Sequence, residues 1–457
     1  MSAARLKNTG RYRVRPPAQP DEIEADNLKT LMRTMDRDAK VATPIRPMGA
    51  NTSSTACNES PSGTVIRMSG LDRILNIDPL NFTVTAQAGI RLYALAEALA
   101  EKGLELAGSY EMTGRTLGGA IAAPCLGPGI GRNNSSLASQ VLSVRLVTGA
   151  GKPLTVARDQ KNLLCAIRSS YGLLGVIVEA TLKVQPIETF SATHRRLDVS
   201  GFCDVVDTLS NGGVGFRFCL MPHRDRVYLD LRRYAAQNGN AWSTPWKIKD
   251  WGESTVLPHV AKSLGRMLPI QSVKYRLIDS VSEATQGIVS PRFLRHGTNA
   301  SNRAQGRSAS STRPLLYSTW CFPASDFSPV LEAYRDFCRD TFEESGYRCD
   351  VPVIGYRISK DASAILSPSF DEPMIALQTA STQPRGWDDF VIDLSDFAEH
   401  WAGMPIFSQS RAVRGDYARQ VHAGRLDFFR RIRRQLDPED RLLTPFLAQY
   451  FGQGSVR

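Results

Sequence analysis

A chain of 457 residues is longer than one hydrophobic core usually supports, so its length predicts two or three lobes. Hydrophobic residues make up 42% and charged residues 22% of the sequence, which is ordinary for a soluble globular protein. No stretch approaches 18 uninterrupted apolar residues and the basic start lacks an apolar signal segment, so neither a transmembrane helix nor a secretory signal is predicted. Residues 1–20 are expected to form a flexible tail.

The N-terminal part predicts alternating strands and helices. Apolar residues recur at helical spacing over 22–38, and 91–102 reads as an amphipathic helix that ends at Gly103. The predicted strands are 41–49, 64–71, 81–88, 140–148 and 176–184. Pro186 closes this first lobe.

After residue 190 the pattern changes to one typical of an antiparallel sheet covered by helices. Strands are predicted at 213–220, 226–233, 315–322, 351–359 and 372–380. Helices are predicted at 257–268, 327–343 and 416–435. The stretch 237–275 otherwise reads as irregular, and the polar residues 296–313 are expected to be mobile.

The cysteines and the net charge restrict the kind of site. The eight cysteines form no CxxC pair and lie far from the six histidines, so no metal site is expected, and reduced thiols indicate a cytoplasmic protein. A formal charge of +11 favours an anionic partner, either a phosphorylated ligand, an acidic membrane surface or nucleic acid, with a generic basic surface as the alternative. No nucleic-acid-reading module accompanies the arginines of 425–434, so nucleic acid is not expected.

Two small-residue segments indicate where a ligand binds. The first, 46–55, runs from a strand into RPMGANTSST, where backbone N–H groups can converge on phosphate oxygens; a solvated turn is the alternative. The second, 113–131, reads TGRTLGGAIAAPCLGPGIG and contains six glycines. Because Gly118 and Gly119 carry no side chain, a flat ring can lie against this backbone.

A family resemblance over residues 40–186 rests on the order of these two segments and three further ones. The further segments are GLDRILNIDPLNFTVTAQAGIRLYAL, SQVLSVRLVTGAG and YGLLGVIVEATLKVQP. The sequence resembles the vanillyl-alcohol oxidase/p-cresol methylhydroxylase (PCMH-type) superfamily and is most similar to its aldonolactone and alditol oxidase branch, with decaprenylphosphoryl ribose oxidase as a neighbour. The resemblance implies an α+β, two-lobed fold. Its parts would be an FAD-binding domain at 21–188, an antiparallel-sheet cap domain for substrate at 189–440, and a C-terminal segment at 441–457 that returns to the FAD lobe.

Carried over by position, the resemblance implies FAD contacts at four places. The first loop would hold the diphosphate through its backbone, the second segment would line the flavin and ribityl chain, 125–127 would pass near the isoalloxazine ring, and 177 would meet the adenine. The implied residues are Pro47, Met48, Gly49, Ala50, Asn51, Thr52, Ser53, Thr116, Gly118, Gly119, Ala122, Cys125, Leu126, Gly127 and Ile177.

The chain departs from the family at the point of flavin attachment. Many members attach FAD through a histidine of the first loop, whereas this chain has no histidine before His194. Noncovalent FAD is therefore predicted, with a cysteinyl link at Cys125 as the alternative. At Leu126 the branch usually carries histidine, which is a further departure.

The cap also departs from the branch at its catalytic positions. A Glu-x-Arg pair of the alditol oxidase pattern reads Gly355-Tyr356-Arg357 here, and a His-Trp-Gly-Lys segment aligns with 406–409, so the glutamate and the lysine are missing. Arg357, Tyr356 and Gln409 are the candidate catalytic residues, for positive charge near the flavin and for proton handling. Tyr356, Gln409, Arg411 and Tyr417 are all candidates for proton handling or hydroxyl recognition.

The resemblance implies an FAD-dependent oxidoreductase that moves a hydride from a hydroxyl-bearing carbon of a sugar-like or other polar substrate to flavin N5. The alternatives are a lipid-linked sugar oxidase, a 2-hydroxyacid dehydrogenase, or a flavin-binding protein without turnover. The Trp- and Lys-rich stretch 242–275 has two interpretations, a peripheral contact with an anionic membrane or a packed insertion of the cap.

Overall fold

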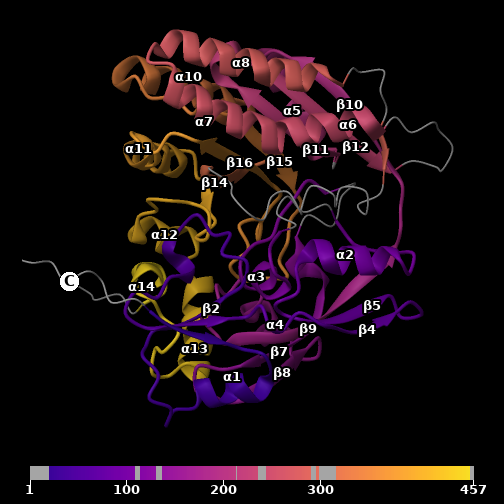
Figure 1. Ribbon diagram of the computed structural model, residues 1–457, viewed down its shortest axis with the longest axis vertical. Coiled ribbons are helices and arrows are strands. Elements are labelled where there is room, and N and C mark those ends of the chain that lie inside the picture. The colour runs from indigo at the N-terminus through magenta and orange to yellow at the C-terminus, as the bar shows by residue number, and fades with distance from the viewer. Residues whose placement is uncertain are drawn as a thin grey trace, which may run out of the picture.

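The chain builds two lobes that lie one above the other in Figure 1. The computed structural model describes residues 20–108, 114–129, 136–212, 214–234, 243–289, 295–297 and 315–452. The predicted N-terminal tail and almost all of the polar segment 296–313 lie outside the described residues. Among the described helices, none has the length and apolar character needed to cross a bilayer.

A small parallel sheet begins the first lobe, in the order β1-β3-β2. Its strands are β1 (Asp21–Glu24), β2 (Ile45–Met48) and β3 (Thr64–Arg67). The helix predicted over 22–38 is shorter, because the chain first pairs as β1 with β3 and then starts α1 (Leu28–Met35) at Asn27, whose side chain caps the helix by accepting from the Thr30 N–H at 2.8 Å.

The second sheet of this lobe is antiparallel, in the order β4-β5-β9-β7-β8, with β6 paired to β9. Its strands are β4 (Ile74–Asp78), β5 (Thr83–Gln87), β6 (Leu104–Leu106), β7 (Val141–Val147), β8 (Pro153–Ala157) and β9 (Val176–Pro186). The helical elements are η1 (Ala56–Asn58), α2 (Leu92–Ala100), α3 (Leu117–Ala122), η2 (Leu137–Gln140) and α4 (Lys161–Ile167). As predicted, Gly103 follows α2 in the left-handed region, with φ +72°.

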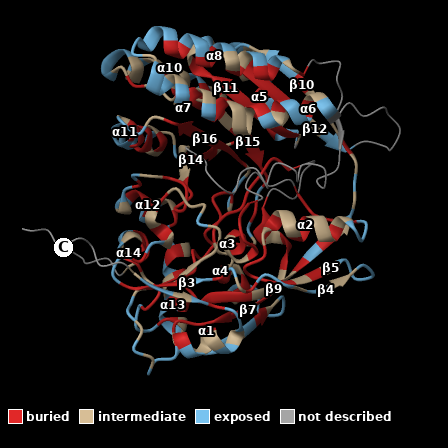
Figure 2. Ribbon diagram, in the orientation of Figure 1, coloured by how far each residue is buried: buried red, intermediate tan, exposed pale blue. Residues whose placement is uncertain are grey.

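The cap is built on an eight-stranded antiparallel sheet, in the order β13-β10-β12-β11-β15-β16-β14-β17. The strands are β10 (Phe190–Leu197), β11 (Gly215–Met221), β12 (Arg226–Tyr234), β13 (Arg295–Gly297), β14 (Leu316–Pro323), β15 (Val353–Ile358), β16 (Met374–Ser381) and β17 (Met404–Pro405). Because side chains alternate along a strand, each cap strand contributes to two faces. Figure 2 shows these strands as largely buried on both faces.

Helices complete the cap, and several of them were not predicted. Those along the chain are α5 (Val199–Asn211), η3 (Pro222–Arg224), α6 (Ser243–Trp251), the π-helix η4 (Gly252–Val256), α7 (Leu257–Met267), α8 (Gln271–Gly287), α10 (Ser328–Ser345) and α11 (Trp387–His400). The irregular stretch predicted around 237–275 is thus mostly helical. Its helical pattern is obscured because α6 buries a lysine, Lys249, which is 1% exposed and pairs with Asp230 at 2.9 Å.

The chain then returns to the first lobe through α12 (Gly415–Val421), α13 (Arg425–Leu436) and α14 (Pro445–Phe451). The single helix predicted at 416–435 is broken at Gly424, whose φ is +61°. In the first lobe α13 lies against α4, and the Ile45 N–H of β2 donates to the Arg441 carbonyl at 2.7 Å. The Ala150 N–H donates to the Leu436 carbonyl at 3.1 Å, so the chain rejoins the first lobe before the predicted boundary at 440.

Candidate active site

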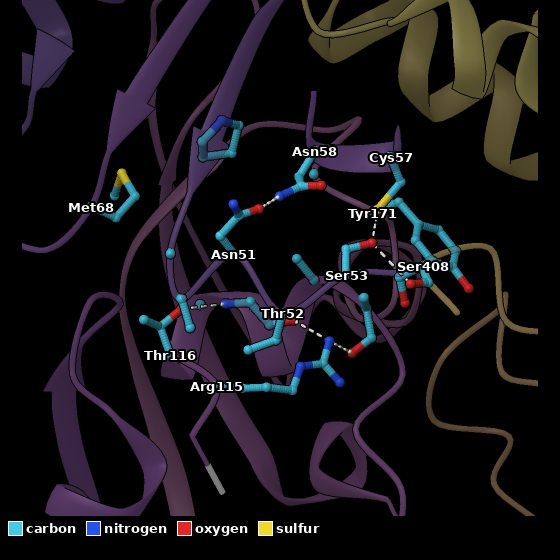
Figure 3. A pocket seen from close by; sticks show the side chains of 18 of the residues that line it. Asn51, Thr52, Ser53, Cys57, Asn58, Met68, Arg115, Thr116, Tyr171 and Ser408 are labelled. Atoms are coloured by element: carbon cyan, nitrogen blue, oxygen red, sulfur yellow. Dashed lines mark hydrogen bonds between the residues drawn. The ribbon is translucent and has the colours of Figure 1, made fainter. Parts of the chain in front are cut away.

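A cavity of about 860 Å³ lies where the first lobe meets the cap. This volume includes space that is open to solvent. Figure 3 shows the pocket with Thr52 and Ser53 near its centre, Met68 on one side and Tyr171 on the other. Of the residues predicted to form the site, those that line the cavity are Pro47, Gly49, Ala50, Asn51, Thr52, Ser53, Thr116, Gly118, Gly119, Ala122, Ile177 and Gln409.

The loop that follows β2 forms one wall, and its glycine permits a close approach to the next wall. A Cβ on Gly49 would lie 2.1 Å from Thr116 Oγ1, so no side chain fits there. Asn51 adopts the left-handed conformation, with φ +53°, and its Oδ1 accepts a hydrogen bond from Asn58 Nδ2 at 2.7 Å. These contacts fix the loop with its backbone toward the cavity.

The hydroxyl groups of this loop bind the cap. Ser53 Oγ donates to the Ser408 carbonyl at 2.9 Å, and Ser54 Oγ donates to the Gln409 carbonyl at 3.0 Å. Thr55 Oγ1 donates to the Phe407 carbonyl at 2.7 Å, and Tyr317 of β14 donates to the Thr52 carbonyl at 2.5 Å. We call these contacts of 52–55 with Tyr317 and 407–409 the loop clamp. The sequence did not reveal it, because the acceptors lie more than 260 residues away.

Helix α3 forms the opposite wall. The Thr116 side chain caps it by accepting from the Gly119 N–H at 3.3 Å. A Cβ on Gly118 would lie 2.8 Å from the Ala88 Cβ, so this glycine packs against β5. A Cβ on Gly119 would meet only Thr116 Oγ1, at 3.1 Å, so Gly119 opens onto the cavity and leaves room for a ligand.

Two buried arginines line the cavity, and the sequence interpretation assigned neither a role. Arg46 is 3% and Arg115 is 6% exposed. Arg46 donates to the carbonyls of Leu442 at 3.1 Å and Tyr171 at 2.6 Å, and its Nε has no partner. Arg115 donates to the carbonyls of Pro124 at 2.8 Å, Gly119 at 2.9 Å and Ala123 at 3.3 Å. Among the described residues neither guanidinium forms an ion pair, although Cys125 lies near Arg115 and Asp437 lies near Arg46, so an anionic ligand would complement them.

A strained loop after α4 completes this side of the cavity. Four of its residues have positive φ: Ser169 (57°), Tyr171 (53°), Gly172 (72°) and Gly175 (151°). The Tyr171 hydroxyl accepts from the Phe407 N–H at 3.3 Å. Further cavity residues that were not predicted are Cys57, Asn58, Met68, Ala88, Ala123, Tyr171, Gly172, Gly175, Tyr317 and Ser408.

The remaining predicted residues lie beside the cavity, outside its lining. These are Met48, Cys125, Leu126, Gly127, Tyr356 and Arg357. Leu126 packs in one apolar cluster with Cys321 and Tyr356, where the first lobe meets the cap sheet. Tyr356 is thus on the face toward the first lobe, but it is buried in this cluster.

Arg357 follows Tyr356 on β15 and therefore points to the opposite face of the sheet. Its Nε donates to the Ser210 carbonyl of α5 at 2.9 Å. The predicted role of Arg357 as positive charge near the flavin is not compatible with this orientation. The period of two in a strand allows only one of these neighbours to face the cavity side.

Replacing Arg357 by methionine should therefore lower stability and spare ligand binding. Loss of the buried hydrogen bonds is expected to reduce the free energy of unfolding by about 1–3 kcal/mol. Urea unfolding measures this loss, and the exposed Arg385→Met is the matched control. A large fall in flavin affinity at unchanged stability would contradict the assignment.

Comparisons with known proteins agree with this arrangement. An FAD binding domain family matches residues 23–157, and the D-arabinono-1,4-lactone oxidase family matches residues 180–450. The chain belongs to the D-arabinono-1,4-lactone oxidase family. The predicted superfamily, branch and α+β fold are confirmed, and the matched FAD binding domain supports FAD as the cofactor.

Individual members and solved structures are similar over different lengths. L-gulono-1,4-lactone dehydrogenase of Mycobacterium tuberculosis (strain H37Rv) is 32% identical over 41% of this chain, and the chain spans only 43% of that enzyme. L-gulonolactone oxidase of Mus musculus is 23% identical over 95% of this chain and 94% of its own. The structure of cholesterol oxidase from B. sterolicum superimposes with a TM-score of 0.75 at 13% identity, covering 95% of this chain and 96% of that one. This last likeness shows the fold.

The cavity of this lactone oxidase family member fits FAD in shape and charge. The space beside Gly119 leaves room for a flat group, and the two carbonyl-bound arginines complement the two negative charges of a diphosphate. The loop backbone at 49–53 and the α3 backbone at 118–119 would hold the cofactor, which supplies hydride-accepting chemistry when bound.

Behind the cavity wall, His422 is buried against Phe407, with ring centroids 5.6 Å apart, and neither ring nitrogen has a hydrogen-bond partner. Burial, with a smaller contribution from Arg425, lowers the pKa of His422 to about 3. The unfolded chain therefore binds this proton more readily between pH 6.5 and 3, so stability falls as the pH falls through this window. The free energy of unfolding then falls by up to about 1.4 kcal/mol for each pH unit.

Replacing His422 by phenylalanine should thus flatten the acid side of the stability profile between pH 6 and 4, measured by urea unfolding at each pH. The exposed His259→Gln is the control. If the free energy of unfolding fell equally with pH in wild type and in His422→Phe, His422 would not be the cause of the acid sensitivity.

Proposed function

We propose that the protein uses noncovalently bound FAD to oxidise a hydroxyl-bearing carbon of a sugar-like 1,4-lactone. The cavity between FAD binding domain and cap carries this proposal, because its wall combines small residues for the ring with two buried arginines for anionic groups. The relatives support the substrate class, since their names give L-gulono-, L-galactono- and D-arabinono-1,4-lactone.

The cap side of the cavity offers two polar groups to a ligand. Ser408 Oγ is buried and has no hydrogen-bond partner among the residues that the structure describes. Gln409 is 6% exposed, and no described residue hydrogen-bonds to its side-chain amide, although its backbone is held by the loop clamp. Buried polar groups are normally satisfied, so these two are expected to bind polar atoms of the flavin or the lactone. Gln409 thereby keeps the recognition role predicted for it.

Substrate oxidation is tested by anaerobic rapid mixing of the flavin-loaded protein with L-gulono-, L-galactono- and D-arabinono-1,4-lactone. Bleaching of oxidised flavin by one of them is the expected result. 2-Hydroxyacids and lipid-linked sugars form the comparison arms. Bleaching only by these arms, or by no compound, would reject the lactone proposal.

Noncovalent attachment is supported by the composition of the first loop and by the cysteines. The first loop, 46–55, contains no histidine, and none of the described histidines lines the cavity. Cys125 lies outside the lining, and burial raises the pKa of its thiol, which disfavours the thiolate. Cys57 lines the cavity, with its Sγ 3.1 Å from Ser53 Oγ.

All flavin should accordingly appear in the supernatant after acid precipitation, for wild type and for Cys57→Ser and Cys125→Ser alike. The measurement is visible absorbance of supernatant and redissolved pellet. Flavin retained in the wild-type pellet, and released by one of the two serine variants, would instead identify a cysteinyl link.

A further inference from the structure

The exposed apolar side chains of the protein are concentrated in one segment of the cap. Of the twelve exposed large hydrophobic residues in the described chain, six lie between 248 and 277. The two most exposed of these are at the turn between α7 and α8, where Met267 is 76% and Ile270 is 62% exposed. We call Met267, Pro269, Ile270, Val273 and Leu277 the α7–α8 tip.

The tip is a second apolar face on helices whose first face is already buried. Ile270, Val273 and Leu277 follow the spacing of three and four residues that places side chains on one face of a helix. Tyr275 and Ile278 on the other face are buried in a cluster with α7. The exposed stripe is therefore not needed for packing of α8 onto the cap.

Buried ion pairs hold this helical layer firmly on the cap sheet. Lys249 of α6 pairs with Asp230 of β12 at 2.9 Å, and Glu253 of η4 pairs with Arg217 of β11 at 3.0 Å. Figure 1 places α8 at the outer edge of the cap, on the side away from the first lobe, and Figure 2 shows exposed surface along it. The tip thus lies on the outer helical layer of the cap and is exposed there.

The charges around the tip favour an anionic surface. Residues 254–278 contain no Asp or Glu and four Lys or Arg residues. Arg266 and Arg276 are exposed beside the apolar stripe. Glu343 and Glu344 end α10 next to the start of α8, so they limit the electrostatic attraction and leave the apolar residues with most of the binding.

We infer that the α7–α8 tip docks the protein peripherally on an anionic lipid bilayer. Met267 and Ile270 enter the boundary between headgroups and acyl chains, while Arg266 and Arg276 reach the lipid phosphates. An exposed turn flanked by arginines fits a lipid interface. It fits a protein interface less well, because such interfaces have a well-packed core. The inference goes beyond the proposed reaction and does not depend on it.

The test is co-sedimentation of the flavin-loaded full chain with phosphatidylcholine vesicles, with and without phosphatidylglycerol. The double variant Met267→Asp/Ile270→Asp should bind the anionic vesicles at least about tenfold more weakly than wild type. Leu80→Asp is the matched control, because Leu80 is 91% exposed at the β4–β5 turn of the other lobe, and it should change binding less than about twofold. Arg266→Gln/Arg276→Gln should weaken binding only to vesicles that contain phosphatidylglycerol.

Absence of wild-type binding to either vesicle would overturn the inference, as would equal binding of wild type and the double aspartate variant. Self-association that this variant abolishes, without vesicle binding, would assign the tip to a protein contact instead. Flavin content and lactone oxidation should be unchanged in the double variant, which separates this test from that of the proposed function.

Discussion

Replacing Gly119 by valine is expected to abolish FAD binding and leave the apoprotein folded. The added side chain points into the cavity, where only Thr116 Oγ1 lies near its Cβ, at 3.1 Å, so it takes the space of the cofactor while meeting little protein. Gly119 is inside α3, and a helix interior favours most residues over glycine, so the apoprotein should be at least as stable. FAD affinity should fall at least about 100-fold, or about 2.8 kcal/mol.

Fluorescence titration of the apoprotein with FAD measures this change, and thermal unfolding of the apoprotein checks the fold. Gly265→Val is the matched control, because Gly265 is also helical, lies in α7 and has nothing within 4 Å of its Cβ position. Unchanged FAD affinity in Gly119→Val would mean that the cofactor does not lie against α3.

Replacing Arg115 by methionine should weaken FAD binding about 10- to 100-fold and riboflavin binding less than about threefold. The two negative charges of FAD are on its diphosphate, which riboflavin lacks. A buried guanidinium in a low-dielectric cavity attracts such an anion strongly. Arg46→Met is expected to act in the same direction, and Arg115→Lys, which keeps the charge, should retain most of the affinity.

Arg168→Met provides the matched control for a purely structural effect. Arg168 also donates to carbonyl oxygens, those of Ser363 and Val141, but it does not line the cavity. Arg168→Met should lower the free energy of unfolding and should not change the affinities for FAD and riboflavin by different factors. If Arg115→Met weakened both ligands equally, the arginine would act on the flavin ring or on the fold.

The backbone part of the site was predictable because it depends on local sequence. Glycine pairs and runs of small residues mark places where a main chain approaches a ligand, so Gly49 and Gly119 could be identified from the sequence. The arginines could not, since their hydrogen-bond acceptors are carbonyl oxygens and not a recognisable sequence motif. Arg46 finds its acceptors at Tyr171 and Leu442, which only the folded chain brings near.

The cap was predicted less completely, for two physical reasons. Alternation along β15 separates Tyr356 from Arg357, but the sequence does not tell which face meets the first lobe. The helix predicted at 257–268 is α7, but α6 and η4 were missed because their buried side includes Lys249 and Glu253, whose ion pairs satisfy charge in the interior. Hydrophobic periodicity is weak where a helix buries paired charges.

The loop clamp makes one short segment both a cofactor wall and the joint between the two lobes. Four hydroxyl groups tie it to the cap, so the cap cannot move away without pulling on this part of the cavity wall. We therefore expect cofactor binding to stabilise the contact between this segment and the cap. The protein without FAD should be cut more readily by a protease near the junction of the lobes, and added FAD should restore its resistance.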